Sequence, residues 1–251
     1  MKKISLFLLF LSFNLHAASE CSDLEMGASI KVTNVGKSKT GISQKYSLRR
    51  QNERTWQVFV NIDFKPTKEA TGKKSTVILE TRKRTQECYD EYAKHLYDEK
   101  GRKLRLFLYD RSKHKHLVDR PREANIKIIG AKERSYSDRW AQGVGCGTIV
   151  HETFHLLGLV DEYHERSIKS GNKTAYNCRH LGPKDSIMRS ITVNQFLEEN
   201  VIYSGQLDAI IYPNCREKNN QYYRCSENAY KTAKSCPSSP SVCYDESWVL
   251  N

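Results

Sequence analysis

The residues best suited to chemistry lie in one short run near the middle of the chain, His151-Glu152-Thr153-Phe154-His155. Two histidines four residues apart on a helix point to the same side, so their imidazoles can share one metal ion. Glu152 would project beside that ion, where its carboxylate can accept a proton from a water molecule. The run therefore predicts a catalytic metal site with His151 and His155 as ligands and Glu152 as general base.

The residues after this run predict a third ligand. Gly158 follows His155 by three positions, where a helix can end and the chain can reverse through a left-handed residue. Such a reversal would bring Asp161 back toward the metal. A catalytic zinc takes three protein ligands and keeps one position open for water. His151, His155 and Asp161 supply three, which predicts one catalytic Zn²⁺ ion as the cofactor.

Other residues near the run are weaker candidates. Glu162 and His164 are rival ligands, although each is more often a surface side chain, and His180 could approach from a later loop. Cys21 is an alternative of another kind, because a thiolate could cap the zinc in a latent form of the protein.

The motif resembles that of the metzincins, whose usual third ligand is His and which include an Asp variant. The string from Gly158 to Tyr163, GLVDEY, is similar to that of bacterial metallopeptidases of the IgA-protease type. Metzincins also carry a tight turn with a Met beneath the metal, and Ser186-Ile187-Met188 matches that Met-turn in type and order. Some families place a Tyr two residues after the Met to bind the transition state. This chain has Ser190 there, so that role is unassigned.

The hydrophobic pattern predicts the elements that must position these residues. Residues 55–64 alternate as a half-buried strand, and residues 88–97 follow a helical period that Gly101 would end. Two further strands are expected at 104–109 and 124–129, and the helix of the His run follows a stretch that contains Gly143, Gly145 and Gly147. A polar connection is expected at 167–185, and after it a helix at 193–201 that could extend to Ile211. The resemblance implies an α+β metzincin-like catalytic domain with a twisted mixed sheet, active-site helix, Met-turn and C-terminal helix.

The N-terminus predicts export. Lys2 and Lys3 precede an almost unbroken apolar run, and Ala17 and Ala18 offer small residues for cleavage. We therefore expect a signal peptide at 1–17, no transmembrane segment after its removal, and a secreted or periplasmic protein. The catalytic domain would cover 18–212, and 213–251, which holds four cysteines, would form a disulfide-rich C-terminal extension.

Cysteine usage agrees with export. All eight cysteines follow the leader, and an even count in an exported chain predicts disulfides. A bond from Cys146 to Cys178 would brace both walls of the site, but eight cysteines allow 105 pairings and the sequence does not choose among them.

Charge restricts the partners. The chain has 41 Lys and Arg against 29 Asp and Glu, a formal net charge of +12, and loss of Lys2 and Lys3 with the leader leaves +10. Such a balance favours an anionic cell-envelope surface. The loop at 111–122, with His114 and His116, is predicted to be a strongly charged solvated turn that could contact an envelope polymer. Nucleic acid is a poorer partner, because a strand with one polar face explains the basic and aromatic residues at 102–109.

These expectations lead to a secreted zinc-dependent endopeptidase that acts on protein or peptide substrates. Two alternatives remain open at this point. One is a zinc peptidase that cuts peptidoglycan stem peptides, which the basic surface favours. The other is a non-enzymatic, basic envelope-binding protein with a structural zinc, although a purely structural site would need no general base such as Glu152.

Overall fold

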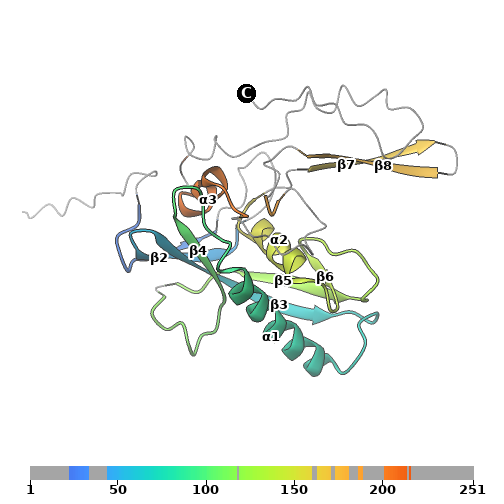
Figure 1. The fold of residues 1–251 in the computed structure, drawn as a ribbon. Helices are drawn as coiled ribbons and strands as arrows, with labels where there is room; N and C mark the ends of the chain where they lie inside the picture. Colours follow the sequence, from blue (N-terminus) through green and yellow to red (C-terminus); the bar gives the residue numbers. More distant parts are fainter. Residues whose placement is uncertain are drawn as a thin grey trace, which may run out of the picture.

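The computed structural model describes residues 23–33, 44–117, 119–159, 163–170, 173–180, 186–188, 201–213 and 215, with the backbone alone for 163–170 and 173–180. These residues form a mixed sheet accompanied by helices (Figure 1). The α+β class predicted from the sequence is confirmed at this level.

A six-stranded sheet is built around the long strand β3. The pairs β1–β2 and β2–β3 are antiparallel, whereas β3–β4, β3–β5 and β5–β6 are parallel. β4 pairs with the first half of β3 and β5 with its second half. The strands span Ser29–Val32 (β1), Tyr46–Asn52 (β2), Thr55–Pro66 (β3), Lys103–Leu108 (β4), Glu123–Ile129 (β5) and Arg139–Ala141 (β6). The three strands expected at 55–64, 104–109 and 124–129 are thus confirmed.

β3 alternates as predicted toward its ends, where Gln57 and Asp63 are only half-buried, but its middle is buried on both faces. Its residues from Val58 to Ile62 are all buried in succession. The second face is covered because the loop before β5 folds over it: the Ser47 hydroxyl of β2 donates to the carbonyl of Asp119 at 3.1 Å, and Phe59 packs edge-on against His114. The loop before β5, which the sequence predicts to be solvated, therefore covers part of the core.

Helix α1 (Lys74–Tyr92) packs against β3 and β4. It begins earlier than the predicted helix and ends earlier too. Gly101 does not end it; instead Gly101 has a φ of 72° in a later turn, where the Asp98 carboxylate accepts from the backbone N–H groups of Lys100 and Arg102.

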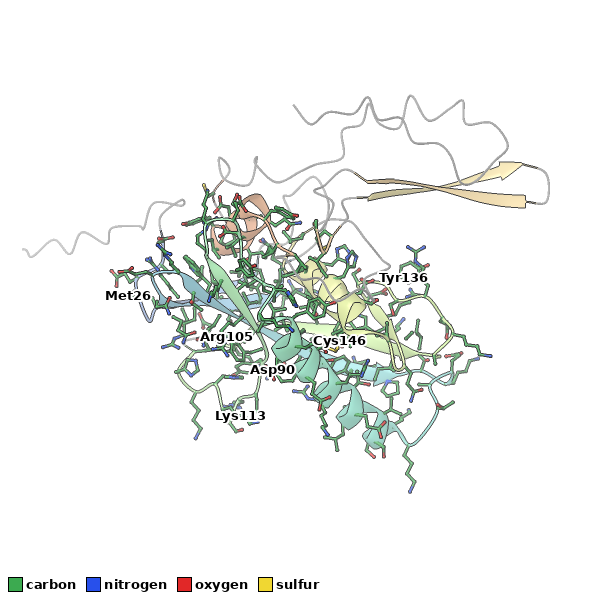
Figure 2. The ribbon with its side chains drawn as sticks, in the orientation of Figure 1. Met26, Asp90, Arg105, Lys113, Tyr136 and Cys146 are labelled. Atoms are coloured by element: carbon green, nitrogen blue, oxygen red, sulfur yellow. A yellow bond between two sulfur atoms is a disulfide. The ribbon has the colours of Figure 1, made fainter. Side chains whose placement is uncertain are left out.

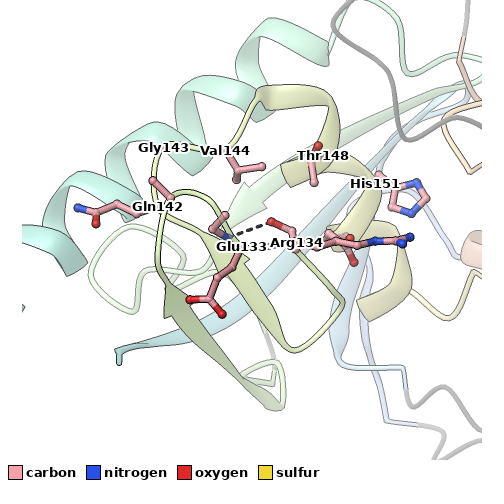
Figure 3. Close-up of a pocket in the computed structure, with 11 residues that line it drawn as sticks. Glu133, Arg134, Gln142, Gly143, Val144, Thr148 and His151 are labelled. Carbon is pink, nitrogen blue, oxygen red and sulfur yellow. Dashed lines mark hydrogen bonds between the residues drawn. The ribbon is translucent and has the colours of Figure 1, made fainter. Parts of the chain in front are cut away.

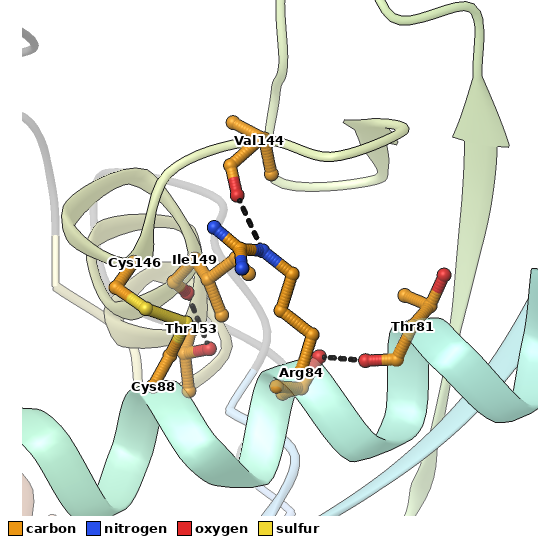
Figure 4. Close-up of a disulfide and its surroundings, with 8 residues drawn as sticks. Thr81, Arg84, Cys88, Val144, Cys146, Ile149 and Thr153 are labelled. Atoms are coloured by element: carbon orange, nitrogen blue, oxygen red, sulfur yellow. Dashed lines mark hydrogen bonds between the residues drawn. A yellow bond between two sulfur atoms is a disulfide. The ribbon is translucent and has the colours of Figure 1, made fainter.

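Three contacts fix helix α2 (Cys146–Leu156) against α1, and Figure 4 shows two of them, the disulfide and the bond from Arg84 to Val144. Cys88 and Cys146 form a disulfide. Arg84 Nε donates to the Val144 carbonyl at 3.1 Å, which ties α1 to the loop before α2. On the buried side, the Tyr89 hydroxyl and the Thr153 hydroxyl are 2.9 Å apart. The helix that carries the His run is therefore held along its length by α1.

The pairing of Cys146 with Cys178 is wrong. Cys146 is the first residue of α2, and the packing of the two helices leaves its Cα 4.9 Å from that of Cys88. Cys215 is also disulfide-bonded. The bond between Cys88 and Cys146 braces α2 against α1 and does not join two walls of the site.

The C-terminal half departs from the predicted pattern. Residues expected to form a polar connection contain an antiparallel hairpin of β7 (Tyr163–Ser170) and β8 (Lys173–His180). Helix α3 (Ser204–Ile211) ends at the residue to which the predicted helix could extend, but it begins only after Val201. Residues 193–200 of the predicted helix lie outside the described residues. The predicted leader, and the predicted extension apart from Pro213 and Cys215, also lie outside them. Among the described helices, none is long and apolar enough to span a bilayer.

Arg102 anchors α3 to the rest of the fold. Its guanidinium pairs with Asp208 of α3 at 2.6 Å and with Asp98 at 2.7 Å, and all three side chains are largely buried. Displacing α3 would separate Asp208 from Arg102 and leave an uncompensated charge in the interior, which costs free energy. The network therefore favours one position of α3 on the rest of the fold.

We predict that the Cys88→Ala/Cys146→Ala double variant loses about 4 kcal/mol of unfolding free energy, because the bond closes a loop with a sequence separation of 58 residues. Urea denaturation under non-reducing conditions measures this loss. Peptide mapping of the wild type should recover the Cys88–Cys146 cross-link. An unchanged urea midpoint in the double variant would show that the disulfide does not stabilise the fold.

Candidate metal centre

His151, Glu152 and His155 lie together on α2 and could hold a metal ion. Their potential ligand atoms all fall within 4.8 Å of one another, and all three residues are buried. The His155 Nε2 and the Glu152 Oε2 are 3.9 Å apart. The clustering predicted from the sequence is confirmed for these three residues.

Hydrogen bonds to backbone carbonyls orient both imidazoles. His151 Nδ1 lies 2.7 Å from the carbonyl oxygen of Ile187, and His155 Nδ1 lies 2.9 Å from that of Leu159. A carbonyl oxygen can only accept, so Nδ1 is the protonated nitrogen of each ring. In the neutral imidazoles the Nε2 atoms then carry the lone pairs that coordinate metals. The donor set therefore fits a divalent ion such as zinc.

The turn at Ser186, Ile187 and Met188 lies directly against the site. All three residues are buried, and the Ile187 carbonyl is the acceptor for His151. Around the turn, the Ile187 N–H donates to Val201 at 2.9 Å, and Gln206 of α3 donates to the Ser186 hydroxyl at 2.7 Å. The sequence placed Met188 near the metal, and the structure brings its turn to His151.

Gly158 adopts the left-handed conformation that its position predicted. Its φ is +93°, two residues after α2 ends at Leu156. The bend brings the Leu159 carbonyl back to His155, so the conformation of Gly158 also orients a histidine. A Cβ at this position would meet the Gln44 Cγ at 2.7 Å.

Several predicted residues are not tested by the described structure. Asp161 and Glu162 lie outside the described residues, as do Ser190 and Cys21. His164 and His180 belong to β7 and β8, of which the backbone alone is described. The third ligand thus remains a prediction.

The described residues of the loop at 111–122 are mostly exposed, as predicted, but His114 turns inward and is half-buried. Its ring packs against Phe59 with centroids 4.8 Å apart, and its Nδ1 accepts from the backbone N–H of Asp110. Burial and the neighbouring His116 lower the pKa of His114, which favours the neutral ring. In Figure 2, Lys113 of this loop lies at the lower left of the view, and Tyr136, which follows the loop that borders the pocket described below, lies at the right.

A pocket of about 260 Å³ opens beside the metal group (Figure 3). Its walls come from the loop after β5, the loop before α2 and the face of α2 itself. The lining residues are Ala131, Glu133, Arg134, Ser135, Ala141, Gln142, Gly143, Val144, Thr148, His151 and Glu152. No motif or spacing pointed to the residues at 131–135, because only the fold brings that loop to the helix.

Comparisons of this chain with protein-family models, with curated proteins and with solved structures find no match. Membership of the metzincins stays a prediction.

We predict that Gly158→Ala destabilises the fold more than Gly27→Ala. Both glycines have positive φ values, +93° and +82°, but a Cβ at Gly27 would meet nothing within 4 Å. The strained backbone costs about 1 to 3 kcal/mol at either position, and the contact with Gln44 adds to it at Gly158 only. Urea denaturation of both variants measures the difference.

The double variant Gly158→Ala/Gln44→Ala separates the two causes. Truncating Gln44 removes the close contact and leaves the backbone strain, so it should restore part of the lost stability. Equal losses for Gly158→Ala and Gly27→Ala would show that the packing at Gly158 is not restrictive.

Proposed function

We propose that this chain is an exported zinc-dependent endopeptidase of the metzincin type. The observation that carries the proposal is the paired orientation of His151 and His155. Each ring donates from Nδ1 to a backbone carbonyl, so both Nε2 atoms are available as ligands beside the Glu152 carboxylate. This group borders an open pocket, as a reacting substrate requires.

The chain's own residues suit peptide-bond hydrolysis. Glu152 is buried at the pocket, where its carboxylate can accept a proton from the attacking water and pass it to the leaving amine. A zinc ion, when bound, supplies Lewis acidity that activates the water and polarises the scissile carbonyl. His151 and His155 need to remain fixed throughout, which their carbonyl partners favour.

The arrangement of elements supports the family resemblance. Parallel strands β4, β3, β5 and β6 precede α2, and the Met188 turn packs behind His151. We propose Asp161 as the third ligand, because the left-handed Gly158 turns the chain three residues before it. An Asp oxygen is an accepted zinc ligand at about 2.0 to 2.2 Å.

The disulfide between Cys88 and Cys146 supports an extracytoplasmic location, because such bonds persist in oxidising compartments. Protein or peptide substrates are therefore proposed to be extracytoplasmic as well. Parallel assays on casein and on purified cell wall would distinguish a general endopeptidase from one that cuts peptidoglycan stem peptides.

We predict that Glu152→Gln keeps its zinc but loses about 10²- to 10⁴-fold in kcat, because the ligands remain while the general base is lost. Elemental analysis of the purified protein measures the metal, and turnover of a peptide with and without chelator measures the activity. Comparable turnover in wild type and variant would rule out this mechanism.

We also predict that Asp161→Ala sharply weakens zinc binding, that Asp161→His retains it, and that Glu162→Ala and His164→Ala bind nearly as wild type does. Competition with a chromophoric chelator measures the four affinities. Loss of metal in His164→Ala together with retention in Asp161→Ala would show that the third ligand is misassigned.

A further inference from the structure

The face of the sheet that points away from α1 carries a row of hydrogen-bond donors. Arg49 of β2, Gln57 of β3 and Arg105 of β4 are cross-strand neighbours, because Arg49 pairs with Gln57 and Gln57 pairs with Arg105. The alternate residues of β4, such as Leu104 and Leu106, point to the other face and join the hydrophobic core. We call Arg49, Gln57 and Arg105 the donor row.

Most donors of this row have no acceptor in the part of the chain that the structure describes. Arg49 donates to the Gly27 carbonyl at 3.4 Å and to the Gln57 side-chain oxygen at 3.0 Å, which uses two of its five N–H groups. The side-chain amide nitrogen of Gln57 donates to no described residue. The Arg105 guanidinium makes neither a hydrogen bond nor an ion pair there, and it lies 5.7 Å from the centroid of the Phe107 ring. A row of donors without an open acceptor favours an anion.

The loop between β4 and β5 extends the positive charge beside the donor row. His114 and His116 pack edge-on against Phe59, with ring centroids 4.8 and 5.8 Å away. Phe59 follows Gln57 by two residues on β3, so both side chains point to the same face. The loop therefore lies on this face and stands out from the sheet next to the donor row.

Further cations of the same strands and loop surround the donor row. All are exposed, and none forms an ion pair with an acid among the described residues: Lys31, Lys103, Arg111, Lys113 and Lys115. Figure 2 shows Arg105 of the row and Lys113 of the loop on the left of the view. The positive charge is thus spread over strands and loop.

Acidic residues of the loop offset little of this charge. The Asp110 carboxylate already accepts from the Ser112 N–H at 2.8 Å and from the Ser112 hydroxyl at 2.6 Å. Glu123 pairs with Arg120 at 3.3 Å, so these two charges balance each other. Asp119, which is exposed, is the other acid of the loop. The face therefore keeps a net positive charge that attracts polyanions.

We propose that this sheet face binds a flexible polymer that carries a phosphate group in each repeat. The planar fork of an Arg matches two oxygens of a phosphate, and the donor row presents two such forks on either side of Gln57. Cations spread over strands and loop suit a polymer with many charges better than a single small anion.

The shape of the face disfavours two other polyanions. A flat lipid bilayer would meet the protruding loop before it reached the donor row, whereas a flexible chain can contact both. Nucleic acid bases stack on open aromatic rings in single-strand binding proteins. The rings on this face already have partners, because Phe107 stacks on Phe59 at 5.2 Å and lies beneath Arg105. A phosphate polymer without bases is the partner that fits.

This inference does not rest on the proposed peptidase function, because the donor row and the metal centre use different residues. Only the place where the polymer is met, the cell envelope, rests on the proposed export of the chain. The binding experiments are therefore done with a chelator present, and a protein without any peptidase activity would still give the expected result.

The test measures the binding of end-labelled, long-chain inorganic polyphosphate to the full chain by fluorescence anisotropy at several salt concentrations. Arg49→Gln/Arg105→Gln should weaken binding roughly tenfold or more and reduce the slope of log K against log salt by roughly 1 to 2. The control Lys74→Gln/Lys83→Gln removes the same charge from exposed positions on α1, and its affinity should stay within about twofold of wild type.

A single variant separates binding from folding. Arg105→Gln removes no hydrogen bond to a described residue, so its urea midpoint should equal that of wild type while its affinity for polyphosphate falls roughly threefold or more. The inference is overturned when polyphosphate does not bind at low salt, or when both double variants weaken binding equally. It is also overturned when poly-glutamate, single-stranded DNA or phosphatidylglycerol vesicles bind more tightly than polyphosphate at equal concentration of anionic groups.

Discussion

The hydrogen bond from His151 to the Ile187 carbonyl joins two segments that are 36 residues apart and holds the ring of a candidate metal ligand in one orientation. This hydrogen bond is buried. Breaking it would leave the ring nitrogen and the carbonyl oxygen with no hydrogen-bond partner and no access to water, at a cost of about 1 to 3 kcal/mol. Ile187 is fixed in turn by Val201, whose own N–H donates to His95 beyond the end of α1. The position of the His151 ring thus depends on the turn at 186–188, on Val201 before α3, and on His95 after α1.

The opposite side of α2 is fixed by different means. The Cys88–Cys146 bond holds its first residue, and the Tyr89–Thr153 contact holds its middle. At its end, the Lys45 N–H donates to the Leu156 carbonyl at 2.9 Å, which satisfies a carbonyl that has no partner within the helix. A helix that bears buried polar groups needs such supports, because a small displacement would expose or misalign all three candidate site residues together.

The predictable part of the fold and site follows from local spacing. The i, i+4 separation placed His151 and His155 on one face, and the need for a left-handed residue identified Gly158. Long-range partners could not be predicted in this way. Cys146 pairs with Cys88 because two helices pack, and the middle of β3 is buried on both faces because a basic loop folds over Phe59. The pocket residues at 131–135 could not be predicted for the same reason, since their loop reaches the pocket only through the order of β5, β6 and α2.

The acceptors that orient the two histidines are main-chain carbonyls, so the site requires a particular side chain at few positions. Any residue type except one that disturbs the backbone could supply the carbonyl at Ile187 or Leu159. Side-chain identity matters at the two histidines and Glu152, and at Gly158, where φ and the contact with Gln44 exclude a Cβ. The geometry of a metal site can therefore persist while the residues around it change, provided that the turn and the helix end keep their backbone conformation.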